Sequence, residues 1–256
     1  MDNIIETHEY KGYKIEIVYD QMPENPMKNW DMIGREAVLK NRDSITGKPD
    51  LILWVDELYD EDIDDELTIT EYLKREAGAV VVVPYKLYDC GSRGMLLEEV
   101  DDAQADGAFY LTEEDLEKEF GNVENARERA RECILAEMKV QNMYYNGEVY
   151  GYAVKEGNDV LDSVWGFYGL DFEKSGLLEE ARSFIDFWED RRENGLCPQC
   201  GKRPEYLVHV YKVQAQYYHD GPKGTPEMNG PERFECPRCR YVIARNRDKA
   251  KAFLEK

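Results

Sequence analysis

Four cysteines form two matching pairs in this sequence, and their type and spacing specify chemistry more clearly than any other residues do. Cys197 and Cys200 enclose Pro-Gln, and Cys236 and Cys239 enclose Pro-Arg, so two CPxC turns stand 35 residues apart. Four thiolates close a tetrahedral shell around zinc and leave no open position for catalysis. The spacing therefore predicts a structural zinc site. Four free thiols or a redox pair are the alternatives, and spacing alone also admits another soft metal such as iron.

The residues between the two turns are typical of a zinc ribbon. Residues 206–218 have the pattern of one long strand, a Gly/Pro-rich loop is expected over 220–231, and residues 233–235 lead into the second turn. A module of about 60 residues has too small a core to fold securely alone. Metal binding would supply the stability that the small core lacks.

The balance of acidic and basic residues changes at the first CPxC turn. The net charge is −21. Residues 1–196 carry 47 acidic and 21 basic residues, whereas residues 197–256 carry 7 acidic and 12 basic residues. Because this break coincides with the first CPxC turn, we predict an acidic domain over residues 1–195 and a zinc-ribbon domain with a basic end over residues 196–256.

Carboxylates gather in three runs within the acidic part, at residues 56–66, 98–106 and 113–119. A folded surface crowded with carboxylates imitates the phosphates of a nucleic acid and attracts the basic groove of a protein that binds one. A plain solvated face is the alternative. A calcium loop is not expected, because Asp65 stands where such a loop needs glycine. The residues predicted to bind a basic partner are Asp56, Glu57, Tyr59, Asp60, Glu61, Asp62, Asp64, Asp65, Glu66, Glu98, Glu99, Asp101 and Asp102.

Basic residues near the C-terminal end give a second possible function, in which a zinc-ribbon adaptor or regulator contacts nucleic acid directly. The candidates for that contact are Arg238, Arg240, Arg245, Arg247, Lys249 and Lys251. Tyr211, Tyr217 and Tyr218 could stack on bases, but they equally suit a half-buried sheet. The basic end could also dock on the acidic part of its own chain.

Enzymatic motifs are mostly missing from the sequence. The three histidines follow no metal-binding pattern, and neither GxGxxG nor GxSxG occurs. Gly47 and Lys48 resemble the end of a phosphate-binding loop, but Arg42 stands where its first glycine is required. Cys133 is expected in the core and Cys90 in a turn, with no base placed beside it. We therefore expect a non-enzymatic protein, and an enzyme with an unrecognised motif is the alternative.

Short strand and helix patterns follow one another along the acidic part. Strands are expected over residues 10–19 (a pair or one bulged strand), 37–39, 51–55, 79–83, 107–111, 147–154 and 160–167, and helices over 68–76, after an N-cap at Thr112, over 123–144 and from Ser175. Pro84 is expected to confine its strand to an edge or an end. The hairpin links favour an α+β fold with antiparallel hairpins and two or three amphipathic helices.

Four segments carry a resemblance to other proteins. Residues 10–17 read YKGYKIEI, residues 24–26 read ENP with WD at 30–31, and NGEVYGY at 146–152 precedes DSVWGFYG at 162–169. Together they resemble an uncharacterised family of small phage and mobile-element proteins, which usually lack a CPxC ribbon. The resemblance implies a phage, prophage or plasmid origin and assigns no catalytic residue. In that setting, an acidic protein suggests an inhibitor of host restriction or CRISPR-type defence.

Localisation is expected in the cytoplasm of the bacterial host. No apolar run reaches the ~18 residues needed to cross a bilayer, and the first residues lack a secretory core. In a protein that is not exported, six cysteines indicate thiols or metal ligands and not disulfides.

Overall fold

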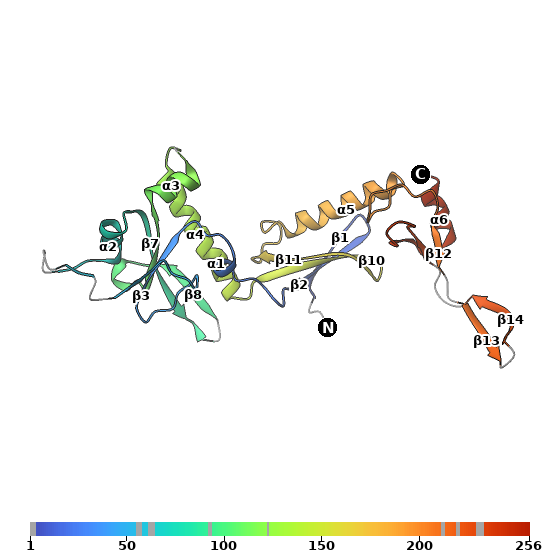
Figure 1. Cartoon of the computed structure of the whole chain (residues 1–256), viewed down its shortest axis with the longest axis horizontal. Coiled ribbons are helices and arrows are strands. Elements are labelled where there is room, and N and C mark those ends of the chain that lie inside the picture. Colours follow the sequence, from blue (N-terminus) through green and yellow to red (C-terminus); the bar gives the residue numbers. More distant parts are fainter. Residues whose placement is uncertain are drawn as a thin grey trace. The chain divides into compact units, whose positions relative to one another are not determined.

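The computed structural model describes most of the chain (Figure 1). The described residues are 4–54, 58–60, 65–91, 94–121, 123–210, 213–218, 221–228 and 233–256, with the backbone alone at 59–60, 65–66, 209, 213–218 and 221–228. Two compact units are present. Unit 1 comprises Met1–His8, Glu16–Ala153 and Ser163–Leu178, and unit 2 comprises Glu9–Ile15, Val154–Asp162 and Glu179–Lys256. This division differs from the predicted boundary at residue 195. Two earlier segments, Glu9–Ile15 and Val154–Asp162, and the helical residues from Glu179 onward belong with the C-terminal module.

Unit 1 contains a five-stranded sheet of order β4-β3-β9-β7-β8. Its strands are β3 (Arg35–Leu39), β4 (Leu51–Leu53), β7 (Ala79–Asp89), β8 (Met95–Glu99) and β9 (Gly107–Thr112). Only β3 and β4 pair in parallel, and the other neighbours are antiparallel. With helices beside mostly antiparallel strands, the predicted α+β class is confirmed.

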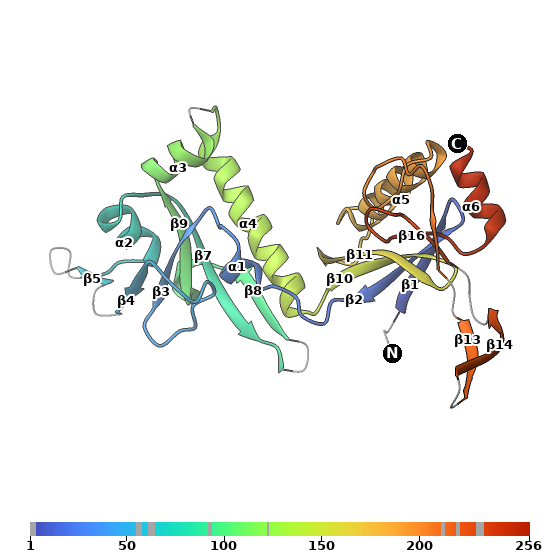
Figure 2. The same ribbon diagram turned by 45° about the vertical axis from the view of Figure 1, so that its right-hand side comes forward.

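Helices cover both faces of this sheet (Figure 2). The longer helices are α2 (Ile69–Glu76), α3 (Glu113–Phe120) and α4 (Ala126–Tyr145). This part of the chain also contains two short helices, α1 (Pro26–Asn29) and η3 (Asp102–Gln104). Successive residues of β9 point to opposite faces. Phe109 belongs to the core that contains α4, and Tyr110 belongs to the core that contains α2. The five-stranded sheet of unit 1 is therefore the middle of three layers, with a hydrophobic core on each of its faces.

Capping residues set where two of these helices begin. Thr68 and Glu71 form a complete capping box at α2, and Thr112 and Asp115 form another at α3, as predicted for Thr112. In contrast, α4 starts three residues later than predicted, and Val123 lies before it and is exposed.

Cys133 is exposed on α4, so its predicted place in the core is wrong. The buried stripe of the helix runs through Ala130, Ile134, Met138 and Gln141. Neighbouring helical residues are rotated by about 100° from each other. Cys133 is one such step away from Ile134 and therefore faces solvent.

Pro84 lies in the middle of β7, and β7 lies between β9 and β8, so the prediction of an edge or end position is wrong. Pro84 pairs with Ala108, and its carbonyl accepts a hydrogen bond from Val100 N at 3.1 Å. Its nitrogen therefore faces the β8 side just beyond Glu99, where β8 has ended. The missing N–H costs no ladder bond, because β8 pairs with β7 only from Tyr85 onward.

A four-stranded sheet of order β1-β2-β10-β11 contributes residues to both units. Its strands are β1 (Ile4–Tyr10), β2 (Tyr13–Tyr19), β10 (Val149–Glu156) and β11 (Asp159–Tyr168). The predicted strand pattern over 10–19 is thus a strand pair that begins earlier, at Ile4. Lys11 and Gly12 turn between the two strands with φ of 50° and 84°, as a tight hairpin requires. The second predicted hairpin, β10–β11, is also present.

Three of the four segments that carry the phage resemblance contact one another within unit 1, and most of residues 10–17 belongs to unit 2. The Trp30 ring meets the Tyr168 ring edge-on at 5.2 Å, and the Tyr168 hydroxyl donates to the Glu24 carbonyl at 2.6 Å. Trp165 lies so close over Gly151 that a Cβ there would stand 2.3 Å from the indole. These residues therefore have a packing role, which their spacing in the sequence alone does not reveal.

A buried carboxylate organises the loop between β3 and β4. Glu36 is 1% exposed and accepts hydrogen bonds from five donors. These are Ser44 Oγ at 2.6 Å, Ile45 N at 2.7 Å, Thr46 N at 3.2 Å, Thr46 Oγ1 at 2.5 Å and Tyr85 Oη at 2.6 Å. The loop before Gly47 thus directs its N–H groups at an anion, but that anion is the protein's own carboxylate. This agrees with the exclusion of a phosphate-binding loop.

Glu137 on α4 makes the stability of unit 1 depend on pH. Burial raises the pKa of this carboxyl to about 7, and one hydrogen bond from Ile33 N only partly opposes the shift. A carboxyl with a raised folded-state pKa binds protons more strongly when folded, so stability should fall as pH rises from about 4.5 to about 7. We expect Glu137→Gln to increase the free energy of unfolding at pH 8 by about 1–2 kcal/mol.

Denaturant unfolding at pH 5 and pH 8 checks this expectation. The variant should flatten the pH profile, whereas Glu132→Gln, at an exposed position of the same helix, should leave it unchanged. Parallel profiles for Glu137→Gln and the wild type would contradict the assignment.

Unit 2 contains the C-terminal module, with a three-stranded sheet of order β12-β15-β16. Its elements are most of α5 (Leu177–Glu193), then β12 (Val208–Val210), β13 (Val213–Tyr218), β14 (Gly221–Met228), β15 (Arg233–Glu235), β16 (Val242–Ala244) and α6 (Arg247–Leu254). The predicted long strand over 206–218 is divided between β12 and β13, which belong to different sheets.

The predicted Gly/Pro-rich loop is largely the strand β14, which pairs antiparallel with β13. In a two-stranded sheet every strand has a free edge, so proline nitrogens at 222 and 226 can be accommodated without loss of a required hydrogen bond. The prediction of a loop was therefore wrong for residues 221–228, because it was based on glycine and proline, which favour turns.

Candidate metal centre

The two CPxC turns have the same backbone structure. Cys197 N donates to Lys202 O at 2.8 Å and Gly201 N donates to Cys197 O at 2.8 Å. In the second turn, the equivalent bonds run from Cys236 N to Tyr241 O at 2.8 Å and from Arg240 N to Cys236 O at 2.9 Å. The residue after the second cysteine is left-handed in both turns, with φ of 66° at Gly201 and 63° at Arg240. Each sequence motif therefore folds into the same local turn.

The four sulfur atoms lie at the corners of a compact cluster. Cys197 Sγ is 3.6 Å from Cys239 Sγ, Cys200 Sγ is 3.8 Å from Cys236 Sγ, and all four atoms lie within 4.8 Å of one another. A tetrahedral ion with metal–sulfur bonds of about 2.3 Å separates its ligands by about 3.8 Å. A disulfide would need about 2.05 Å. The cysteines that the sequence predicts as ligands therefore fit one metal ion.

Burial and hydrogen bonds act in opposite directions on these thiols. Burial raises the pKa of the Cys197 thiol far above its ordinary value. Burial alone would also raise the pKa of Cys236, but backbone N–H groups of Cys239 and Arg238 lower it to about 7. Four thiolates this close together repel one another, so full ionisation requires a cation among them. The chemistry of the donor set thus suits a soft metal cation.

Neighbouring elements within unit 2 hold the two turns. The β15 strand ends directly before Cys236, and β16 follows the second turn. From α5, Arg191 Nη1 donates to the Pro198 carbonyl at 2.6 Å in the first turn, and Trp188 meets the Tyr241 ring edge-on at 5.3 Å. A small apolar cluster of Phe234, Ala244 and Ala250 supports the sheet. This core is small, which agrees with a module that depends on a metal.

The acidic residues predicted to bind a partner are only partly described. Asp56, Glu57, Glu61, Asp62 and Asp64 lie outside the described residues, and the backbone alone is described for Tyr59, Asp60, Asp65 and Glu66. There, β5 (Tyr59–Asp60) pairs antiparallel with β6 (Asp65–Glu66). The structure thus pairs residues 59–60 with residues 65–66 of the first acidic run.

The second run is less uniformly negative than its sequence suggests. Glu98 and Asp101 are exposed and form no ion pair among the described residues. Glu99 forms an ion pair with Arg131, and Asp102 accepts a hydrogen bond from Thr70 N at 2.9 Å. Part of this charge therefore stabilises the fold and is not available as an anionic surface.

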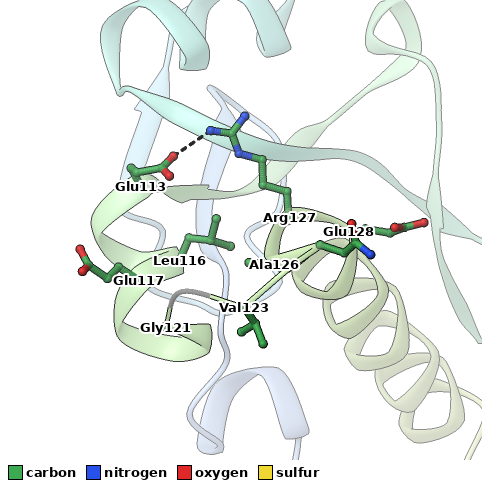
Figure 3. Close-up of a pocket in the computed structure, with 9 residues that line it drawn as sticks. Glu113, Leu116, Glu117, Gly121, Val123, Ala126, Arg127 and Glu128 are labelled. Atoms are coloured by element: carbon green, nitrogen blue, oxygen red, sulfur yellow. Dashed lines mark hydrogen bonds and ion pairs between the residues drawn. The ribbon is translucent and has the colours of Figure 1, made fainter.

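A groove between α3 and α4 is lined by Glu113 and Glu117, two residues of the third acidic run (Figure 3). Its volume is about 510 Å³, and Leu116 and Val123 form an apolar floor. Glu113 pairs with Arg127 at 2.9 Å across one end, and Glu117 and Glu128 stand on either side with their carboxylates directed outward (Figure 3). We refer to this feature as the α3–α4 groove.

The basic candidates do not form one continuous patch of free charge. Arg245 binds Asp159 through two hydrogen bonds of 2.8 and 2.9 Å. Lys251 lies 3.7 Å from Glu255, and Arg240 lies 3.9 Å from Glu235. Arg238 and Lys249 are exposed and form no ion pair within the described ranges, and Arg247 has a partner.

The remaining candidate residues give no catalytic constellation within the described part of the chain. Cys90 is exposed near a turn, as expected, and its thiol lies 4.0 Å from the Tyr88 carbonyl oxygen. His8 pairs with Glu6 at 2.9 Å. His219 lies outside the described residues, and the backbone alone is described at His209.

Two features escaped sequence reasoning, and both depend on tertiary contacts. In the sequence, nothing distinguishes Glu36 from other acidic residues in strands, because its burial and its five donors depend on the folded structure. Trp188 lies on α5, and its indole N–H is buried without a hydrogen-bond partner among the described residues. No local pattern marks either property.

No known protein family, curated protein or solved structure matches this chain. The relation to phage and mobile-element proteins therefore stays a prediction. Among the helices that the structure describes, none combines the length and the apolar character needed to cross a lipid bilayer.

Proposed function

We propose that the chain is a non-enzymatic protein of a phage or other mobile element, and that its acidic surface binds and blocks a nucleic-acid-binding protein of the bacterial host. The excess of 47 acidic over 21 basic residues in residues 1–196 carries the proposal. A field of this sign repels nucleic acid and attracts a basic groove. An inhibitor of restriction or of a CRISPR-type nuclease is the kind of protein that would use it.

The α3–α4 groove supports this proposal with a specific surface. Glu117 and Glu128 line the groove, and Glu114 and Glu124 are next in sequence to lining residues. All four are exposed and form no ion pair among the described residues. The apolar floor offers contact area that excludes water, and Val123 is 42% exposed there. Interfaces combine such an apolar centre with a charged rim, which selects partners of opposite sign.

We further propose that the metal is zinc and that it has a structural role. An all-cysteine shell gives zinc its preferred tetrahedral coordination and leaves no site for a water or a substrate. The sulfur separations of 3.6 and 3.8 Å support this geometry. In this proposal the ion stabilises the module, and the module adds a second contact surface to the acidic one.

Affinity capture from a nuclease-treated host lysate, followed by mass spectrometry, would identify the partner. Binding of the purified partner should weaken as salt increases, and duplex DNA should compete with it. We expect Glu117→Gln/Glu128→Gln to weaken binding by about tenfold, which corresponds to roughly 1.4 kcal/mol. The matched control Glu24→Gln/Asp43→Asn removes the same charge at exposed positions outside the groove and should change binding by less than about twofold.

Three outcomes would contradict the proposal. One is capture of no protein that binds nucleic acid. Another is an affinity that is indifferent to salt and to competing DNA. The third is an equal loss of affinity in the groove variant and in its control, because that would leave only a general effect of net charge.

A further inference from the structure

A groove of about 670 Å³ lies within unit 2, next to the second CPxC turn. Its walls come from the β10–β11 turn, the end of α5, β16 and the start of α6. Four cationic side chains line it, from Arg192, Arg240, Arg245 and Lys249. Pockets that hold organic ligands have volumes of about 300–1,000 Å³. The groove therefore has the size of a binding site, and we call it the ribbon groove.

Two of the four cations are neutralised inside the ribbon groove. Arg192 pairs with Glu156 at 3.2 Å, and Arg245 pairs with Asp159 at 2.8 Å. These two carboxylates are the acidic residues that line it. The groove is thus left with an excess of two positive charges.

The two remaining cations have no close carboxylate partner of their own. Lys249 forms no ion pair among the described residues. Arg240 is 3.9 Å from Glu235, whose carboxylate is held more closely by Arg233 at 2.7 Å. A ligand that presents phosphates to Arg240 and Lys249 would complete the charge balance.

Part of the lining of the ribbon groove is apolar and aromatic. Trp188 and Tyr241 line it in edge-on contact at 5.3 Å, and Val160 is 56% exposed. Trp188 is 3% exposed, and its indole N–H is buried with no hydrogen-bond partner in the part of the chain that the structure describes. A buried donor without an acceptor is costly, and a ligand with carbonyl or phosphate oxygens could supply the acceptor.

We propose that the ribbon groove binds a short stretch of single-stranded nucleic acid, with phosphates at Arg240 and Lys249 and a base against the apolar wall. Single strands offer unstacked bases together with phosphates. A duplex keeps its bases stacked and cannot insert one into a groove of this size. This site is separate from the acidic surface of unit 1, so either proposal can fail without the other.

Fluorescence anisotropy with the full-length, zinc-loaded chain tests this proposal. The probes are labelled DNA and RNA single strands of ~10 nucleotides, within the usual site size for single-strand binding. We expect Arg240→Gln/Lys249→Gln to weaken binding at least tenfold and to reduce the salt dependence. The control Lys202→Gln/Lys256→Gln removes the same charge at exposed positions outside the ribbon groove and should cost less than threefold. Arg240→Lys/Lys249→Arg keeps the charge and should retain binding.

Several results would overturn the proposal. They are the absence of binding to either single strand at 50 mM salt, equal losses in the first two variants, or equal affinity for a duplex of the same length. Equal affinity for polyglutamate would also overturn it, because it would indicate an acidic peptide as the ligand. Circular dichroism and zinc content of each variant establish that loss of binding does not come from unfolding.

Discussion

Cys236→Ser should unfold the C-terminal module and abolish stoichiometric metal binding. Cys236 is 1% exposed, and its thiol is one of four that lie within 4.8 Å of one another. Structural zinc contributes roughly 10–16 kcal/mol of apparent binding free energy in small modules. A serine hydroxyl cannot replace a thiolate ligand, so most of that stabilisation would be lost. Hydrogen-exchange mass spectrometry should show β15, β16 and α6 exchanging at unfolded rates.

Cys133→Ser is the matched control for this experiment. Cys133 is exposed and lies outside the metal cluster, so its substitution should leave metal content and exchange unchanged. Removal of metal from the wild type with a chelator should reproduce the effect of Cys236→Ser. If the Cys236→Ser module exchanges like the wild type, metal does not stabilise it.

Glu36→Ala should destabilise unit 1 more than any other single substitution that we predict there. The carboxylate is 1% exposed and accepts hydrogen bonds from five donors. Its loss would leave buried N–H and hydroxyl groups without an acceptor, and each such group costs about 1–3 kcal/mol. We expect a total loss of about 3–5 kcal/mol in the free energy of unfolding.

Denaturant unfolding, with hydrogen exchange in β3 and β9 as the local readout, measures this loss. Glu24→Gln at an exposed position should change stability by less than about 0.5 kcal/mol. The loss of stability in Glu36→Gln should lie between those of Glu24→Gln and Glu36→Ala. One side-chain oxygen remains as an acceptor, but the new amide group faces hydrogen-bond donors. A change below about 1 kcal/mol in Glu36→Ala would show that the five hydrogen bonds contribute little.

Features encoded by a few neighbouring residues could be predicted from the sequence. The CPxC turns, the capping box at Thr112 and the β10–β11 hairpin depend on local geometry, and the structure has all three. Each of them is specified within about six residues, so no knowledge of the tertiary fold is needed.

Features that depend on distant residues could not be predicted in this way. Pro84 is tolerated inside the sheet only because β8 ends at Glu99. The segment at 221–228 forms a strand because residues 213–218 lie beside it, although its composition is typical of a loop. The donors around Glu36 come from another strand and a loop that fold around it.

The distribution of free negative charge also depends on distant residues and could not be predicted from the sequence. Sequence counts give the net charge correctly, but they cannot tell which carboxylates are neutralised. Glu99, Asp106 and Asp115 form ion pairs with Arg131, Arg42 and Arg35. At the α3–α4 groove, Glu113 pairs with Arg127, but Glu117 and Glu128 form no ion pair among the described residues, which is why the proposed contact is located there.

We propose that the stability of the C-terminal module depends on four thiolates that share one zinc ion, and native mass spectrometry of the intact chain tests this proposal most directly. The predicted result is a mass increase that corresponds to one zinc ion per chain, lost on acidification and absent from Cys236→Ser. A wild-type chain purified without chelator that carries no metal, or that carries iron in place of zinc, would contradict it.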